Sequence, residues 1–227
     1  METEGISESD KQEMMKFADI NQENVVEKYS QVAEKYDHTI EDVLGYPDPA
    51  QIHEMLVKYG IPKEAAILDL GCGTGLLGKE LIEKGYTNIV GIDASPEMLE
   101  KAEAKGYKEL KEVFLCSNSF PEEYTGKFDV AVSAGLLVHH LPADIIEEKM
   151  SCLRPKESED DKRYIIFSTR ETCMNIYGYK DKIKELEDAG KLKTEEVVSF
   201  KRFENIEGKG EVAIFRTLVA CVYVLSV

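Results

Sequence analysis

Apolar residues along the chain fall into two alternating kinds of segment. Short continuous apolar runs predict buried strands at 65–70, 89–92, 110–116, 128–133 and 164–169. Apolar residues at three- and four-residue spacing predict helices with one buried face at 76–82, 96–102, 145–153 and 176–186. Because strands alternate with helices, the pattern predicts an α/β fold with a doubly wound, mostly parallel sheet and helices on both faces.

The two ends of the chain depart from this alternation. Two β-rich segments, 197–203 and about 214–225, have no helical pattern between them and predict an antiparallel C-terminal hairpin at the edge of a Rossmann-like, seven-stranded sheet. Near the N-terminus, residues 25–36 carry a helical apolar stripe, and a further helix runs from Pro47 to Gly60. We expect a single domain with three parts: a disordered tail (1–10), a helical lid (11–60) and the ligand-binding domain (61–227).

A glycine-rich segment follows the first strand. In 69–75, Asp-Leu-Gly-Cys-Gly-Thr-Gly, three alternating glycines let the chain turn sharply and let a ligand approach the backbone. The free N–H groups at the start of the next helix face this loop. Eighteen residues after Gly75, the second strand ends in Asp93, whose carboxylate can accept both hydroxyls of a ribose. These features predict a nucleoside-binding βαβ unit.

The glycine pattern fits two families, and its register distinguishes them. Gly73, Gly75 and Gly78 satisfy the G-x-G-x-x-G expression of dinucleotide enzymes. In that fingerprint the first glycine follows the strand directly, but here that residue is Gly71, and the third glycine position then falls on Leu76. The remaining pattern, Asp-x-Gly-x-Gly-x-Gly, resembles motif I of the class I S-adenosylmethionine-dependent methyltransferases. A dinucleotide enzyme stays as the alternative.

Further segments strengthen this resemblance. Residues 91–98, Gly-Ile-Asp-Ala-Ser-Pro-Glu-Met, resemble the second cofactor segment of the superfamily, and 128–133 followed by His139-His140-Leu141 resembles its fourth. Residues 29–37, with 168–170 and 175–177, are similar to the small methyltransferase-like group named after the Williams-Beuren syndrome chromosomal region.

The resemblance implies S-adenosylmethionine as cofactor and S-adenosylhomocysteine as product. It places the methionine end on the backbone around Cys72, oriented by Asp69, and the ribose hydroxyls on Asp93. The adenine ring would lie against Ala94 and Met98, with its amino edge at an asparagine where the superfamily more often has aspartate. The cofactor residues implied in this way are Tyr29, Tyr36, Asp69, Gly71, Cys72, Gly73, Asp93, Ala94, Met98, Ser117, Asn118 and Ser133.

Candidate catalytic and substrate residues are fewer. His139 and His140 are candidates for a general base, although the superfamily often has histidine there for structural reasons. Arg170, at the end of the fifth strand, is a candidate ligand for a substrate carboxylate or a surface ion-pair partner, and Tyr177 is a second substrate candidate. Five widely spaced cysteines without a C-x-x-C pair argue against a zinc site or disulfide framework, so we expect no metal.

Composition narrows the partners. Forty-four acidic against 28 basic residues give a formal charge of −16, without any Lys/Arg-rich block, which argues against nucleic acid. No apolar run approaches the roughly 18 residues of a membrane span, and the acidic N-terminal residues do not resemble a targeting signal. We expect a cytoplasmic protein without membrane partners, whereas its oligomeric state is not predicted.

Methyl transfer asks mainly for positioning, because a methyl group on a sulfonium is already activated. Apolar and aromatic residues near the predicted mouth, such as Tyr29, Leu136 and Met174, suit a small acceptor that is closed off from water. The sequence therefore predicts a methyltransferase that acts by in-line displacement on an oxygen or nitrogen atom of a small molecule. Two alternatives remain: a protein methyltransferase, because an acidic surface suits basic polypeptides, and a non-catalytic cofactor-binding or interaction protein.

Overall fold

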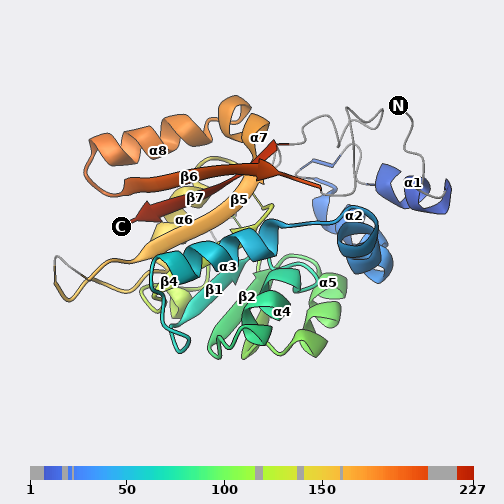
Figure 1. The fold of residues 1–227 in the computed structure, drawn as a ribbon, viewed down its shortest axis with the longest axis horizontal. Helices are drawn as coiled ribbons and strands as arrows, with labels where there is room; N and C mark the ends of the chain where they lie inside the picture. The colour runs from blue at the N-terminus through green and yellow to red at the C-terminus, as the bar shows by residue number, and fades with distance from the viewer. Residues whose placement is uncertain are drawn as a thin grey trace.

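The computed structural model describes residues 8–16, 20–21, 23–115, 120–136, 141–158, 161–203 and 219–227. Its centre is a seven-stranded sheet in the order β3-β2-β1-β4-β5-β7-β6 (Figure 1). The strands are β1 (Ile67–Leu70), β2 (Ile89–Asp93), β3 (Glu109–Glu112), β4 (Val130–Ala134), β5 (Tyr164–Arg170), β6 (Lys193–Lys201) and β7 (Val219–Ser226).

The pairing confirms the predicted fold class. Strands β1 to β5 are parallel, and β7 is antiparallel to both β5 and β6. The predicted hairpin is therefore present, although β6 begins four residues before the predicted 197–203 segment. Strand β3 ends at Glu112, earlier than predicted, and residues 113–115 continue as a loop.

Eight α-helices are described, and most agree with the apolar spacing. The predicted 176–186 helix is instead two helices, separated where Gly178 takes a left-handed φ of 77°. The helix predicted over 25–36 is α-helical only to Val32 and continues through a 3-10 turn (Ala33–Lys35) and a π-helical turn (His38–Val43). The helices are α1 (Glu8–Met15), α2 (Val25–Val32), α3 (Asp48–Lys58), α4 (Leu76–Glu83), α5 (Pro96–Ala102), α6 (Ile145–Ser151), α7 (Glu171–Ile176) and α8 (Tyr179–Asp188).

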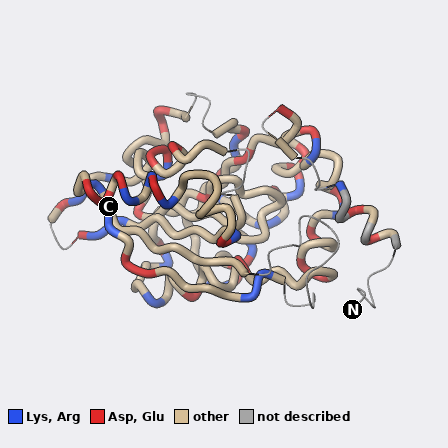
Figure 2. The backbone as a smooth tube through the Cα atoms, turned by 90° about the horizontal axis from the view of Figure 1, so that it is seen from above, with Lys and Arg blue, Asp and Glu red and all other residues tan. Residues whose placement is uncertain are grey.

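Charged residues are spread over the whole described backbone. Figure 2 shows Lys and Arg interspersed with the more numerous Asp and Glu. Many of these side chains form exposed pairs, such as Lys184 with Asp188. Such pairs contribute little to stability individually, so the fold depends mainly on its apolar layers.

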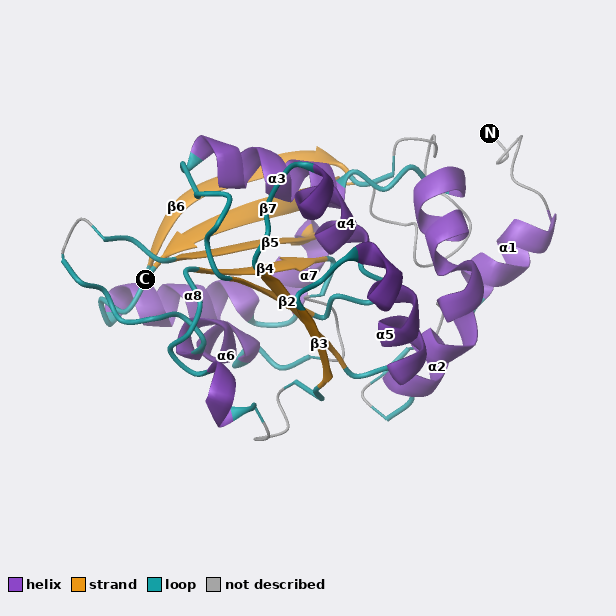
Figure 3. Ribbon diagram, turned by 90° about the horizontal axis from the view of Figure 1, so that it is seen from below, coloured by secondary structure: helices purple, strands orange, loops and turns teal. Residues whose placement is uncertain are grey.

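Two apolar layers sandwich the sheet (Figure 3). Strand residues alternate between the two faces, so Ile67 joins one layer and Leu68 the other. The first layer contains Ile52 and Leu56 of α3 together with α4, and the second contains apolar residues of α6, α7 and α8, such as Ile145. This arrangement leaves the carboxyl ends of the parallel strands uncovered by either helical layer.

The predicted lid of residues 11–60 contains helices that lie in two places. Helix α3 packs against β4, β5, β7 and α4, in one of the layers that cover the sheet. Helices α1 and α2 lie beyond the carboxyl ends of the strands (Figure 1). Helix α1 begins at Glu8, inside the predicted tail, and residues 1–7 lie outside the described residues.

Tyr107 explains three glycines of the nucleoside-binding unit. Its hydroxyl donates to Asp69 (2.7 Å) and accepts from the Gly78 N–H (3.0 Å). A Cβ on Gly78 would lie 2.1 Å from the Tyr107 ring, and Cβ atoms on Gly91 and Gly75 would lie 2.8 and 3.0 Å from it. Glycine at these positions therefore makes room for the Tyr107 side chain between β2 and α4.

We predict that Gly78→Ala lowers the free energy of unfolding. Helix propensity alone would favour alanine by about 1 kcal/mol, but overpacking costs roughly 1 to 3 kcal/mol, and the Gly78–Tyr107 hydrogen bond would be disturbed. The expected net loss is about 1 to 2 kcal/mol, measured by urea unfolding. In a Tyr107→Leu background the same change should be neutral or stabilising. An equal loss in both backgrounds would show that Tyr107 is not the reason for glycine.

Candidate functional site

A cavity of about 780 Å³, part of it open to solvent, lies at the carboxyl ends of the parallel strands. Residues from the ends of β1, β2 and β4, from the loop after β3 and from helices α2 and α5 line it. Seven of the predicted cofactor residues are among them. The lining comprises Val25, Tyr29, Tyr36, Gly71, Gly73, Asp93, Ala94, Met98, Val113, Phe114, Leu115, Ala134, Gly135, Leu136 and Leu141.

The glycine loop forms one wall of this cavity. The Ile92 carbonyl accepts hydrogen bonds from the N–H groups of Gly71 (2.8 Å) and Cys72 (3.0 Å), which holds the loop against β2. Gly71, Gly73 and Gly75 all have positive φ, at 68°, 55° and 89°, a region that glycine adopts without strain. A Cβ on Gly73 would meet no protein atom within 4 Å, so this backbone faces open space that a ligand can fill.

Asp93 lies where the loops after β1 and β2 meet. One carboxylate oxygen accepts from the Gly73 N–H and the other from the Ser95 N–H, both at 2.9 Å. Burial raises the pKa of Asp93, and these backbone hydrogen bonds oppose the rise. Because each carboxylate oxygen has a second lone pair, Asp93 retains the capacity to accept two ribose hydroxyls.

Asp69 lies beneath the same loop and lines an adjoining cavity of about 340 Å³ with Cys72. Its Oδ2 accepts from Tyr107, whereas its buried Oδ1 has no partner among the described residues. Burial raises the pKa of Asp69 to about 7, against the lowering effects of the Tyr107 hydrogen bond and the nearby Lys149 cation. An orphaned carboxylate oxygen here suits a cationic group, as the predicted ammonium contact requires.

The opposite wall of the main cavity is apolar and suits an adenine ring. Helix α5 begins at Ser95, whose hydroxyl accepts from the Met98 N–H (3.2 Å) and so places Met98 against the cavity. Phe114 and Leu115, which the sequence analysis did not single out, complete this wall. The predicted adenine contacts at Ser117 and Asn118 lie outside the described residues.

Tyr29 and Tyr36 line the cavity from the N-terminal segment. Their ring centroids are 6.3 Å apart, and they pack with Val32, Ala33 and Met98 in one apolar cluster. Burial raises the pKa of both tyrosines, so both hydroxyls stay protonated at neutral pH. The two predicted aromatics therefore face the same cavity as Asp93.

Ser133, one of the predicted cofactor residues, is not among the residues that line the cavity. It is fully buried on β4, and its hydroxyl accepts a hydrogen bond from Lys149 of α6 (2.7 Å). Because side chains alternate along a strand, Ser133 faces the α6 layer whereas Ala134 faces the cavity. The motif thus led to a strand end at the cavity, where Ala134 and not Ser133 is a lining residue.

Of the predicted catalytic and substrate residues, the structure describes only Arg170 and Tyr177. His139 and His140 lie outside the described residues. Arg170 ends β5 beside the site but is not among the residues that line the cavity, and Tyr177, 39% exposed after α7, is not among them either. Within the described ranges, no cluster of metal-ligating side chains and no helix able to span a membrane is found.

Sequence reasoning missed Tyr107 and Tyr46. Tyr46, which precedes α3, lines the adjoining cavity with Asp69. For Tyr107 a signal existed, because glycines inside a helix and inside a strand indicate that something bulky approaches them. For Tyr46, only the packing of α3 against the sheet brings it to the site.

The raised pKa of Asp69 predicts a specific pH dependence. Folded Asp69 keeps its proton up to about pH 7, whereas the unfolded chain loses it near the ordinary value of 3.8. Between these values the folded state binds more protons, so rising pH favours unfolding. We expect the stability of the wild type relative to Asp69→Asn to fall from pH 4 to pH 7 and then level off, as measured by urea unfolding. Parallel stability curves for the two proteins would show that Asp69 titrates normally.

Comparisons with known proteins agree with this geometry. Residues 67–156 match the model of a methyltransferase domain family. The chain is 36% identical over 124 residues to methyltransferase-like protein 27 of Homo sapiens, covering 53% of this chain and 50% of that protein. It is 31% identical over 114 residues to EEF1A lysine methyltransferase 2 of Mus musculus, covering 49% of this chain and 47% of the other. The chain thus spans about half the length of these curated relatives.

A solved structure supports the fold over nearly the whole chain. Magnesium protoporphyrin IX methyltransferase from Synechocystis, solved with bound S-adenosylmethionine, superposes with a TM-score of 0.56 at 15% identity, covering 96% of this chain and 91% of that one. The finer resemblance to the Williams-Beuren region group is compatible with the human relative. Residues 67–156, from β1 through α6, match a methyltransferase domain, as the motifs in this part of the chain predicted.

Proposed function

We propose that the protein transfers a methyl group from S-adenosylmethionine to an oxygen or nitrogen atom of a small molecule. The observation that supports this most directly is the meeting of Gly73, Asp93 and Met98 around one cavity at the carboxyl edge of the sheet. Ligands of open α/β sheets bind at this edge. S-adenosylmethionine supplies a methyl group that its sulfonium has already activated.

The described residues provide binding and orientation. Asp93 would accept the ribose hydroxyls, the backbone around Gly73 would hold the methionine end, and Asp69 Oδ1 would face the ammonium directly or through water. Holding an acceptor about 3 to 3.5 Å from the methyl group, in line, can contribute roughly 7 to 11 kcal/mol. An acceptor that arrives protonated also needs a base, and His139 or His140 remain our proposals for that role.

Two observations favour a small acceptor. The cavity is lined mainly by apolar side chains with a few polar groups, which is typical of small-molecule sites. Tyr29, Tyr36 and Val25 also cover the cavity from the N-terminal side, which narrows access for a polypeptide. A protein acceptor is the second candidate, because one relative is EEF1A lysine methyltransferase 2, whose name gives a lysine of a protein as the methyl acceptor. Binding without turnover is the third.

A reducing compartment suits this protein. Cys72, Cys152, Cys173 and Cys221 are all free and buried, and burial raises the pKa of the Cys72 and Cys152 thiols. Free thiols of this kind are usual in the cytoplasm, which is the location we propose.

We also propose that α2 and the turns after it, residues 25–43, form a mobile lid. Polar contacts hold this segment to the glycine loop and α5: Thr74 donates to Asp37 (2.5 Å), Lys105 pairs with Asp37 (2.8 Å) and Ser30 donates to Glu97 (2.5 Å). Pairs at the surface contribute roughly 0.2 to 1 kcal/mol each. The apolar cluster of this segment with Met98 is also small beside the layers of the sheet, so the segment opens more easily than the apolar core.

Amide hydrogen exchange tests the lid. We expect exchange in residues 25–43 to slow by about tenfold or more when S-adenosylhomocysteine binds, because Tyr29 and Tyr36 line the cavity and would contact the ligand. Exchange in β1 should already be slow without ligand, since all its residues are buried. Ligand binding that leaves residues 25–43 unchanged would make them a fixed part of the fold.

A labelling experiment tests the function itself. Purified protein is incubated with methyl-tritiated S-adenosylmethionine and a cell extract separated into small molecules and proteins. We expect label in the small-molecule fraction with the wild type but not with Gly73→Val, whose side chain would occupy the open space at the loop. Gly190→Val is the matched control, because Gly190 has a similar φ of 67° and equal space but lies outside the cavity.

Each outcome of the labelling experiment separates the candidates. Label confined to the protein fraction would favour the second candidate, a protein methyltransferase. Cofactor binding without any label would favour the third. Loss of labelling in both glycine variants would mean that strain at positive φ, and not blocking of the site, explains the effect.

A further inference from the structure

Two arginines at the carboxyl edge of the sheet, Arg170 and Arg202, lack the carboxylate ion pairs that Arg154 and Arg163 form. Arg154 pairs with Asp129, and Arg163 pairs with Asp161. Arg170 and Arg202 form no ion pair within the described part of the chain, and the buried Nε of Arg170 and Nη1 of Arg202 have no hydrogen-bond partner there. In a chain with 44 acidic residues, the absence of an ion pair for these two arginines among the described residues requires an explanation.

The sheet topology brings these two arginines to one place. In the register, Arg170 of β5 lies opposite Ala220 of β7, which lies opposite Phe200 of β6. Since β7 is antiparallel to both neighbours, β5 and β6 run in the same direction and end at the same edge. Arg202 follows β6 directly, so both guanidinium groups lie at the edge that carries the cavity.

Arg202 reaches the wall of the cavity. Its Nη2 lies 3.8 Å from where a Cβ on Gly135 would be, and the Tyr46 hydroxyl lies 2.7 Å from that point. Gly135 itself lines the cavity. The Arg202 guanidinium carbon is 5.1 Å from the centroid of the Phe203 ring and 5.9 Å from that of Tyr46, so the two rings hold the cation in place.

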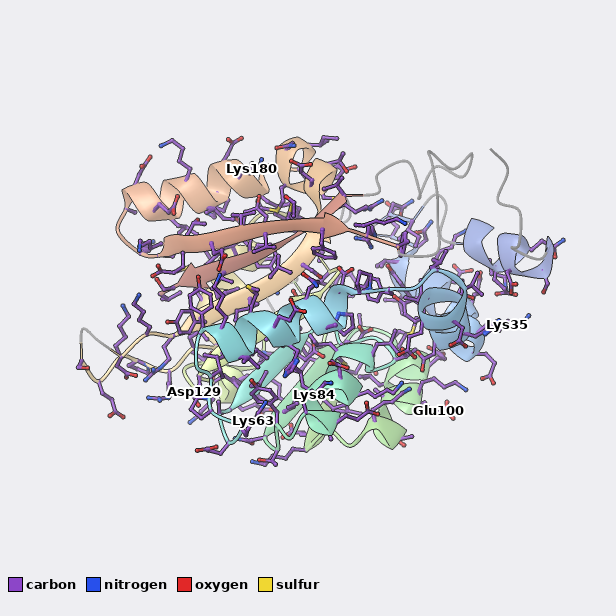
Figure 4. The ribbon with its side chains drawn as sticks, in the orientation of Figure 1. Lys35, Lys63, Lys84, Glu100, Asp129 and Lys180 are labelled. Carbon is purple, nitrogen blue, oxygen red and sulfur yellow. The ribbon has the colours of Figure 1, made fainter. Side chains whose placement is uncertain are left out.

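Arg170 lies at the end of β5, at the same edge of the sheet. Both Arg170 and Arg202 act electrostatically on Tyr29, which lines the cavity, and their positive charges oppose the burial that raises its pKa. By contrast, the lysines labelled in Figure 4, such as Lys63 and Lys180, lie on the outside of the molecule, where water solvates them. The two arginines therefore place positive charge at the carboxyl edge of the sheet, in a protein whose net charge is −16.

From this geometry we infer that the methyl acceptor is a carboxylate-bearing small molecule, whose carboxylate is bound by Arg202 together with Arg170. The inference rests on the proposed methyl transfer and names its class of substrate. A buried guanidinium N–H without an acceptor is costly, and an anionic ligand would supply the missing acceptor. A guanidinium is planar, and one that packs against aromatic rings can bind a carboxylate through two parallel hydrogen bonds.

Neighbouring charges favour an anion over a lysine. Asp48, fully buried with Oδ2 accepting from Ser168 (2.5 Å), lies near Arg202; burial raises the pKa of Asp48, and the Arg202 cation opposes that rise. A lysine side chain of a protein substrate would instead meet two like charges, which disfavours its approach.

The test uses the full chain saturated with S-adenosylhomocysteine and compares benzoate, benzamide, phenyl phosphate and benzylamine as probes, with binding measured by ligand-observed NMR. We expect benzoate to bind at least tenfold more tightly than benzamide, and more tightly than phenyl phosphate or benzylamine. Benzoate binding should weaken as ionic strength rises. Arg202→Gln should lower benzoate affinity roughly tenfold or more, and Arg170→Gln should lower it as well.

A matched control keeps the result specific. Arg154→Gln removes the same charge from an arginine that pairs with Asp129, away from the cavity, and should leave benzoate affinity unchanged. Calorimetry of S-adenosylhomocysteine binding should give similar affinities for wild type, Arg202→Gln and Arg154→Gln.

The outcomes separate this inference from the proposed function. If S-adenosylhomocysteine does not bind the wild type, the proposed function fails. If it binds but benzoate and benzamide bind alike, or neither binds, the carboxylate inference fails while the proposed function stands. Tighter binding of phenyl phosphate or benzylamine would also overturn the inference, in favour of a phosphorylated or a cationic acceptor respectively.

Discussion

The loops after β1 and β2 are joined by a small set of hydrogen bonds, and the rest of the site depends on them. The Ile92 carbonyl accepts from two N–H groups of the glycine loop, and the Asp93 carboxylate accepts from Gly73 and Ser95. These bonds fix the loop wall, the carboxylate and the start of α5 relative to one another. A ligand therefore meets a site whose polar groups are already oriented, which reduces the ordering that binding would otherwise require.

The sequence predicted this part of the site because its residues are close along the chain. The glycine loop and Asp93 flank a single βαβ unit, so a motif read at fixed spacing captures their geometry. The predicted start of helix α5 at residue 96 is confirmed, with Ser95 as its cap. The alternation of strands and helices and the C-terminal hairpin followed from apolar periodicity.

What the sequence could not predict depends on contacts between distant segments. Tyr107 reaches Asp69 and Gly78 only because the chain before β3 returns along α4. Which way the Ser133 side chain faces depends on the strand, because a shift of one residue reverses the face. Arg202 reaches the sheet edge that carries Arg170 only after the hairpin is folded onto β5. Such pairings require the three-dimensional register, which periodicity alone does not give.

The residues that would distinguish one methyl acceptor from another lie around the cavity at the carboxyl edge of the sheet and not in the apolar core. The apolar layers and the glycine loop would serve any acceptor, whereas Tyr29 and Tyr46 line the two cavities and Arg170 and Arg202 lie at the same edge of the sheet. One measurement tests the central account most directly: a crystal structure of the protein with S-adenosylhomocysteine. We predict the ribose hydroxyls on Asp93, the adenine against Met98 and the amino acid end beside Gly73. Ligand bound elsewhere, or bound in this cavity without contact to Asp93, would contradict the account.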